Sequence, residues 1–134
     1  MMKQKVLFVC IENSCRSQMA EGFAKKLGKE VLEAWSAGSK PSRKINEGAI
    51  QVMKEKGIDL ADHKSKGLSD LPKIKWDYII TMGCGDECPF VIGKKRVDWD
   101  IPDPKNLPMD EFRKIRDLIE SKVMNLIDEI KQSH

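Results

Sequence analysis

The chain begins with the stretch that decides its fold, Lys5-Val-Leu-Phe-Val-Cys10-Ile-Glu-Asn-Ser-Cys-Arg16-Ser17. Residues 5–10 are β-branched, aromatic and aliphatic, and a segment that is apolar on both faces is typical of a buried parallel strand. After a short polar turn, apolar residues recur every three or four positions over 17–27, and Gly28 follows as a stop signal. The stretch therefore predicts a strand, a tight turn and a helix in direct succession.

The remaining segments continue this alternation. A second strand is predicted over 31–35, closed by a turn at 36–38, and a helix runs from an Asn46 cap to Gly57. A third strand covers 76–81, a short fourth strand lies near 97–99, and the apolar spacing from Phe112 to Ile130 predicts a long amphipathic helix. Alternating strands and helices indicate an α/β fold, a four-stranded parallel sheet with helices on both faces.

Length and composition narrow the class of protein. The 134 residues, 40% of them hydrophobic, are expected to form a single domain, 1–134. The longest apolar run, residues 6–11, is far shorter than the ~20 residues of a membrane span. We expect a cytoplasmic, monomeric protein whose four cysteines are thiols, with no membrane or nucleic-acid partner, since the net charge is only +3.

The turn after the first strand has the features of an anion-binding loop. A strand-to-helix turn aims several backbone N–H groups into one concavity, and the helix dipole adds positive potential there. A guanidinium completes such a site with a fork that suits a tetrahedral oxyanion. The predicted oxyanion-binding residues are Ile11, Glu12, Asn13, Ser14, Cys15, Arg16 and Ser17.

The same loop predicts a nucleophile. Its positive potential stabilises a thiolate at Cys10, and the Ser17 hydroxyl is placed to donate a hydrogen bond to that thiolate. The alternative is that Cys10 is a small core residue at a strand end and that Arg16 is a solvated helix residue. The position between the first strand and the first helix favours the functional interpretation.

A second pair of cysteines follows the third strand in Cys84-Gly-Asp-Glu-Cys88. Glycines on both sides of Cys84 allow that thiol to move, and two thiols at this spacing can form a disulfide. The loop is expected at the same end of the sheet as Cys10, where parallel sheets bind ligands. Two alternatives stay open, namely two unrelated buried thiols, or a zinc site shared with Cys10 and Cys15.

Pro102-Asp103-Pro104 holds a carboxyl group in a stiff loop before the last helix. Above an anion site this carboxyl group could protonate a leaving oxygen, although an aspartate in such a dipeptide can also be a simple turn residue. His63 and His134 are expected to be surface residues rather than ligands.

These motifs in order, Cys10-x5-Arg16-Ser17, Ser36-Ala-Gly38 and Asp103-Pro104, resemble the low-molecular-weight protein tyrosine phosphatase superfamily. The stretch Asn13-Ser-Cys-Arg-Ser-Gln-Met-Ala-Glu-Gly22 is similar to its thioredoxin-coupled arsenate reductase branch. The resemblance implies the strand order 2-1-3-4 and an enzyme that has no bound cofactor and uses an external thiol reductant, thioredoxin.

The resemblance also assigns roles to residues. It implies that Cys10 attacks arsenate held by Arg16, that Asp103 is the general acid, and that Cys84 and Cys88 are successive resolving thiols. The alternative within the superfamily is a tyrosine phosphatase that acts through a cysteinyl-phosphate. Phosphatase members place tyrosines after Asp-Pro, whereas Lys105 and Asn106 follow here, and this favours a small inorganic anion.

Some reductases of this type bind a monovalent cation beside the anion loop. Asn13, Glu21 and Ser36 match three of its contacts, but Lys66 stands where a carboxylate would be. We therefore expect no metal ion, and our hypothesis is that the Lys66 ammonium replaces the cation. For Cys15 two interpretations remain, a residue that lines the loop or a protective disulfide partner of Cys10.

Overall fold

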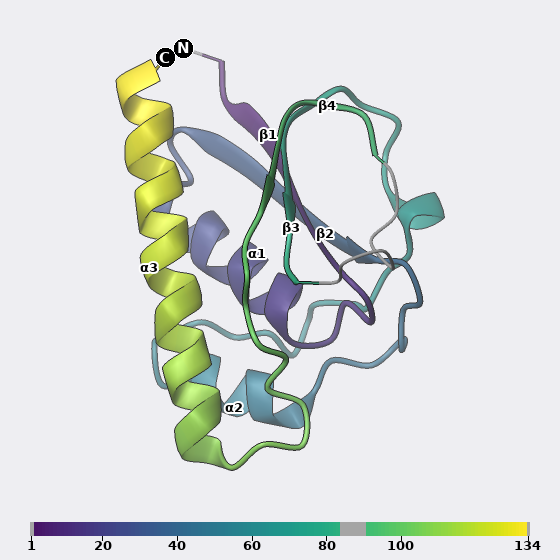
Figure 1. The fold of residues 1–134 in the computed structure, drawn as a ribbon, viewed down its shortest axis with the longest axis vertical. Helices are drawn as coiled ribbons and strands as arrows, with labels where there is room; N and C mark the ends of the chain where they lie inside the picture. The colour runs from purple at the N-terminus through teal and green to yellow at the C-terminus, as the bar shows by residue number, and fades with distance from the viewer. Residues whose placement is uncertain (1, 84–90, 134) are drawn as a thin grey trace.

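Four parallel strands form the centre of the computed structural model, which describes residues 2–83 and 91–133 (Figure 1). They are β1 (Gln4–Cys10), β2 (Leu32–Gly38), β3 (Trp76–Thr81) and β4 (Gly93–Asp98). The order β2-β1-β3-β4 confirms the prediction. The strand β1 is hydrogen-bonded to a neighbour at each edge and is covered on both faces. This central position explains why its side chains are apolar on both sides.

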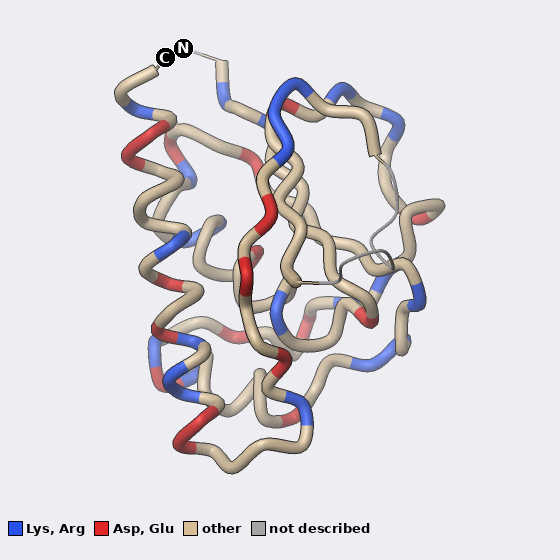
Figure 2. Tube along the Cα trace, in the orientation of Figure 1, with Lys and Arg blue, Asp and Glu red and all other residues tan. Residues whose placement is uncertain are grey.

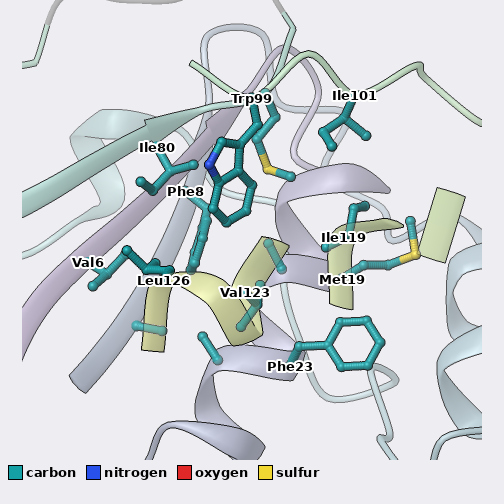
Figure 3. Packing of buried hydrophobic residues seen from close by; sticks show 14 of the residues in the cluster. Val6, Phe8, Met19, Phe23, Ile80, Trp99, Ile101, Ile119, Val123 and Leu126 are labelled. Atoms are coloured by element: carbon teal, nitrogen blue, oxygen red, sulfur yellow. The ribbon is translucent and has the colours of Figure 1, made fainter. Parts of the chain in front are cut away.

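One face of the sheet carries the α-helices α1 (Arg16–Leu27), α2 (Glu47–Lys54) and α3 (Met109–Ser133). Val6 and Phe8 of β1 point into this layer, where Phe8 packs against Trp99 with ring centroids 5.8 Å apart (Figure 3). Met19 and Phe23 of α1 and Ile119 and Val123 of α3 close the same core. This packing fixes where α1 begins relative to the end of β1.

The opposite face is covered differently. Leu7 and Val9 of β1 pack in a smaller cluster under a 3-10 helix, η1 (Leu68–Asp70), and the segment that follows it. Trp35 and Trp76 meet edge to face in this cluster at 5.2 Å. We expected helices on both faces of the sheet. In the described residues the three α-helices all pack in the larger cluster, and the 3-10 helix η1 is the only helix at the other face.

Three boundaries differ from the expectations. The predicted turn at 36–38 is wrong, because these residues continue β2 and pair with residues 8–10 of β1. The helix α2 does begin after Asn46, whose side chain accepts from the Gly48 N–H, but it ends at Lys54 and not at 57. The edge strand β4 begins at Gly93, earlier than predicted. Its exposed residues 94–96 are basic, and without an apolar run the sequence does not indicate where the strand begins.

Charges of both signs are interspersed over the surface, and they alternate along α3 (Figure 2). None of the helices in residues 2–83 and 91–133 is both long and apolar enough to cross a membrane. The carboxyl ends of β1 and β3 lie side by side, because Val9 of β1 is in register with Thr81 of β3. The loops that carry the predicted site residues therefore start from neighbouring positions.

Candidate active site

The Cys10 thiol lies at the floor of the loop between β1 and α1. Its residue is 2% exposed, and Sγ accepts a hydrogen bond from the Asn13 N–H at 3.3 Å. The Ser17 hydroxyl oxygen is 2.8 Å from the same sulfur. Asn13 adopts a positive φ of 52°, which turns the loop back over the thiol. The geometry brings together three residues that the sequence placed in one site.

The carbonyl groups of this loop point away from it. Backbone N–H groups of the segment after β2 donate to the carbonyl oxygens of Cys10, Ile11 and Glu12, at 3.3, 2.8 and 3.0 Å. The Asn46 N–H donates to the Ser14 carbonyl at 3.1 Å. These bonds hold the carbonyl groups against the neighbouring segments, and a strand-to-helix loop held in this way can present N–H groups to an oxyanion.

The start of α1 adds to this potential. The helix has no side-chain cap at its N-terminus and no acidic residue in its first turn. Its first N–H groups and its dipole are therefore not neutralised locally and favour an anion in the loop. Sequence reasoning placed the oxyanion here but missed the outer shell after β2, since hydrogen bonds between distant backbone segments leave no residue-type signal.

Gly38 allows the loop to lie against the end of β2. A Cβ atom at this position would overlap the Ile11 carbonyl oxygen and lie 2.9 Å from the Asn13 nitrogen. The Ser36-Ala-Gly38 motif is therefore explained by a close backbone approach, and not by the turn that we expected.

The Arg16 guanidinium is held from the far side by the ends of two other segments. Its Nη1 donates to the carbonyl oxygens of Met82 at 2.6 Å and Ile101 at 3.1 Å. Gly83, with a φ of 74°, leaves room for it, since a Cβ atom there would lie 3.2 Å from Nη1. The side chain is buried although it is charged, and its bonds to these two carbonyl oxygens fix its orientation.

Asp103, the predicted general acid, lies beside Arg16. Its Oδ2 lies 3.8 Å from Arg16 Nη2, and the carboxyl group is about half exposed. The Lys105 N–H donates to Asp103 Oδ1 at 3.0 Å and fixes the loop. A half-exposed carboxyl group beside the guanidinium has the position that a general acid would need.

Lys105 also makes a contact that sequence reasoning missed. Its ammonium donates to both carboxylate oxygens of Glu12 at 2.9 Å, and this hydrogen bonding raises the pKa of Lys105. The pair lines a cavity of about 330 Å³ beside the oxyanion loop, together with Ser14 and Lys44. The complementary charges of residues 12 and 105 were visible in the sequence, but nothing there indicated that they meet.

Cys15 is a buried free thiol, as is Cys10. Burial raises the pKa of Cys15 to about 12, against a smaller opposite effect of the hydrogen bond with Ser14. Cys15 is therefore protonated and a poor nucleophile near neutral pH. Cys84 and Cys88 lie outside the described residues, and so does His134.

The predicted cation contacts form a charged cluster behind the loop. Glu21 is buried, accepts a hydrogen bond from Ser36, and lies 2.5 Å from the ammonium of Lys25 and 3.7 Å from that of Lys66. Burial alone would raise the pKa of Glu21, but the two lysines and Ser36 outweigh it and lower the pKa. In the described part of the chain, no group of three or more His, Cys, Asp and Glu side chains could hold a metal ion.

His63 is only partly exposed, so the prediction of a surface residue holds in part. Its side chain is 16% exposed, and Nδ1 lies 2.9 Å from Gln18 Oε1. Its sequence neighbours are charged and polar, and they give no sign of this contact with Gln18 of α1.

Comparison with known proteins agrees with this geometry. Residues 5–134 match the family model described as low molecular weight phosphotyrosine protein phosphatase. The chain is 39% identical to the glutaredoxin arsenate reductase of a Synechocystis species, over 95% of this chain and 98% of the relative. It is 38% identical to an arsenate reductase of Staphylococcus aureus, over 93% and 97%.

Solved structures agree as well. An arsenate reductase in the phosphate binding state superposes with a TM-score of 0.86 at 39% identity, covering 95% of this chain and 98% of that one. A thioredoxin-dependent arsenate reductase of Corynebacterium glutamicum gives a TM-score of 0.79 at 31% identity, with 98% of this chain matching 64% of that one. From the match over almost its entire length, the chain belongs to the low molecular weight phosphotyrosine protein phosphatase family.

Proposed function

We propose that this protein is an enzyme that reduces arsenate to arsenite with Cys10 as the nucleophile. One observation carries the proposal. The Cys10 sulfur is buried under a loop whose carbonyls are held outward, with the Ser17 hydroxyl 2.8 Å from it and Arg16 already oriented beside Asp103. Similar chains over nearly the whole length carry the name arsenate reductase, which supports the same reaction.

The first step is a displacement at arsenic. The Cys10 thiolate attacks, a sulfur–arsenic bond forms and an arsenic–oxygen bond breaks. The departing group is a hydroxyl group of hydrogen arsenate, which takes the proton of Asp103 and leaves as water. Loop N–H groups from residues 11–17 and the Arg16 guanidinium stabilise the charge on the remaining oxygens.

The second step transfers two electrons to arsenic. The Cys84 thiolate attacks Cys10 Sγ, the sulfur–arsenic bond breaks with its electron pair on arsenic, and arsenite leaves. A Cys10–Cys84 disulfide remains. Cys88 then attacks Cys84, which frees Cys10 as a thiol and leaves a Cys84–Cys88 disulfide for an external dithiol. The roles of Cys84 and Cys88 rest on their place in the sequence.

The external reductant in this proposal is thioredoxin, in the cytoplasm. A similar chain from Corynebacterium glutamicum is named as thioredoxin-dependent, whereas a Synechocystis relative is named for glutaredoxin. A cysteine pair that ends as a disulfide within one loop presents the substrate that a thioredoxin dithiol reduces. No resident cofactor takes part in these steps, and the enzyme acts as a monomer.

Arsenate-dependent NADPH oxidation with thioredoxin and its reductase tests the reaction and the relay. Cys10→Ser abolishes all turnover. Cys84→Ser releases no arsenite catalytically, and Cys88→Ser releases one arsenite per chain and then stops. A parallel assay with glutathione and glutaredoxin identifies the reductant, and full multiple turnover of Cys84→Ser or Cys88→Ser would disprove the relay.

Hydrolysis of an aryl phosphate, measured on the same variants, distinguishes the reductase from a phosphatase. A cysteinyl-phosphate mechanism needs Cys10, Arg16 and Asp103 but neither Cys84 nor Cys88. Hydrolysis of an aryl phosphate at a high rate, with no arsenate reduction, would assign the protein to phosphatase chemistry.

Lys66 takes the place of a monovalent cation in this proposal. Its ammonium lies 3.7 Å from Glu21 Oε1 and donates to the Lys64 carbonyl at 3.1 Å. A buried carboxylate with two ammonium partners needs no further positive charge. Replacing sodium by potassium is then expected to change neither the melting temperature nor the affinity for arsenate. A rise of either in potassium alone would contradict the role proposed for Lys66.

A further inference from the structure

A continuous chain of hydrogen bonds links His63 to the Cys10 thiol. His63 Nδ1 is 2.9 Å from Gln18 Oε1, and Gln18 Nε2 donates to Asn13 Oδ1 at 2.8 Å. Asn13 Nδ2 donates to Ser17 Oγ at 2.7 Å, and Ser17 Oγ is 2.8 Å from Cys10 Sγ. Gln18, Asn13 and Ser17 are fully buried, so no solvent competes for these bonds.

The chemistry of the two amides sets the direction of each bond. Asn13 Oδ1 accepts from the Lys66 N–H at 2.8 Å as well as from Gln18, so the Asn13 amide nitrogen must face Ser17. Ser17 Oγ is then an acceptor towards Asn13, and its own hydrogen is free to point at the Cys10 sulfur. A hydroxyl that donates to sulfur favours the thiolate over the thiol.

The Gln18 amide is oriented in the same way. Its two N–H groups donate to Asn13 Oδ1 and to the Lys64 carbonyl oxygen at 2.9 Å, and the Asn13 carbonyl oxygen at 3.3 Å can only share one of these hydrogens. Its oxygen Oε1 must therefore face His63 and can only accept, so His63 Nδ1 carries the hydrogen. The histidine is the only side chain of the described residues with a hydrogen bond to that oxygen.

We propose that His63 is a positioning residue for the Cys10 nucleophile, because its Nδ1–H holds the Gln18 amide in the orientation that makes Ser17 donate to the thiolate. The inference rests on Cys10 being the nucleophile of the proposed function. Without the Nδ1–H donor, Gln18 Oε1 is left buried and unpaired, and rotation of that amide towards another donor relaxes the hold on Asn13.

The charged surroundings of His63 agree with a neutral ring that donates. Glu21 Oε2 lies 3.8 Å from Nδ1. The other charged groups that act on the ring are Lys25, which lies on α1 like Glu21, and Lys66 and Asp59. Burial lowers the pKa of His63, with Lys25 and Lys66 in the same sense and the two carboxylates opposing. Near neutral pH the Nδ1–H tautomer therefore needs no added proton to make its bond.

Alkylation of Cys10 by iodoacetamide tests the proposal without arsenate or thioredoxin. In the full chain carrying Cys84→Ser and Cys88→Ser, Cys15 stays protonated, and the rate at Cys10 reports its thiolate across about pH 5 to 9. His63→Ala is expected to move the rate profile to higher pH and to slow the reaction at neutral pH about three- to tenfold, the worth of one hydrogen bond.

Two matched variants separate this role from a structural one. His63→Asn keeps an N–H donor near the position of Nδ1 and restores the rate to within about twofold of the parent. In a Ser17→Ala background, His63→Ala has no further effect, because the last bond of the chain is already missing. Melting temperatures establish that each variant is folded, and His63→Leu fills the ring's space without a donor if the alanine variant does not fold.

Three results would overturn the proposal. They are an unchanged profile in a folded variant that lacks the donor, an Asn variant as slow as the alanine variant, or effects of His63→Ala and Ser17→Ala that multiply. Because the readout is the thiol alone, a failure of the arsenate relay leaves this test intact, and the two proposals fail separately.

Discussion

Lys105 donates to both carboxylate oxygens of Glu12 at 2.9 Å and so joins two loops that lie 93 residues apart in the chain. Glu12 belongs to the oxyanion loop, where a free carboxylate would repel the substrate. The Lys105 ammonium neutralises that charge at the rim of the site. Since both side chains are partly exposed, the pair matters more for the anion than for folding.

Lys105→Met is expected to raise the KM for arsenate about two- to fivefold with little change in kcat, because an unpaired Glu12 opposes the anion through a solvent-screened contact. The double variant Glu12→Gln/Lys105→Met returns the KM to near the original value. Steady-state kinetics at low and high salt measure the effect, which shrinks as salt is added. An equal loss in both variants would contradict the neutralising role.

Arg16→Lys is expected to weaken binding of inorganic phosphate, an unreactive analogue, about 10- to 100-fold. A lysine cannot donate to the Met82 and Ile101 carbonyls and still present a fork to the oxyanion. Titration calorimetry measures the affinity, and the melting temperature falls in parallel because two buried carbonyls lose a donor. Phosphate affinity that stays within twofold would show that the backbone N–H groups suffice.

Gly38→Ala is expected to displace the oxyanion loop, since the new methyl group would overlap the Ile11 carbonyl oxygen. Both stability and phosphate affinity fall, and the free energy of unfolding decreases by about 1–3 kcal/mol, as is typical of overpacking. Gly67→Ala is the matched control, because its nearest neighbour, a side-chain atom of Pro41, is 3.4 Å away. Urea unfolding and phosphate titration of both variants measure the difference, and equal effects would contradict a specific contact at Gly38.

Glu21→Gln is expected to make the free energy of unfolding depend less steeply on pH in acid. The pKa of Glu21 is lowered in the folded protein, so its contribution is fully present above the ordinary carboxyl value of about 4.5 and is lost as pH falls through the folded pKa. Urea unfolding of the wild type is then steeper with pH below this value than that of the Gln variant. Identical acid slopes would mean that the Lys25 and Lys66 partners do not lower the pKa of this carboxyl.

The local elements near the site could be predicted because their signals are local. The apolar run of β1, the polar turn and the periodicity of α1 fix where Cys10, Arg16 and Ser17 lie relative to one another. The strand order could be predicted from family resemblance. The exposed basic edge strand β4 was placed too late and the end of β2 too early, because an edge strand lacks an apolar run and a small-residue triplet resembles a turn.

The sequence by itself determined the chemistry of the loop: a thiol, a guanidinium and a hydroxyl at fixed spacing around a strand-to-helix turn. Only the tertiary structure decided how those groups are held. Three sets of hydrogen bonds join residues from distant parts of the chain: those of the loop carbonyls, those of Arg16 with the Met82 and Ile101 carbonyls, and that of His63 with Gln18. Such contacts depend on how the helices and loops pack on the sheet. They cannot be predicted from residue type and spacing within one segment.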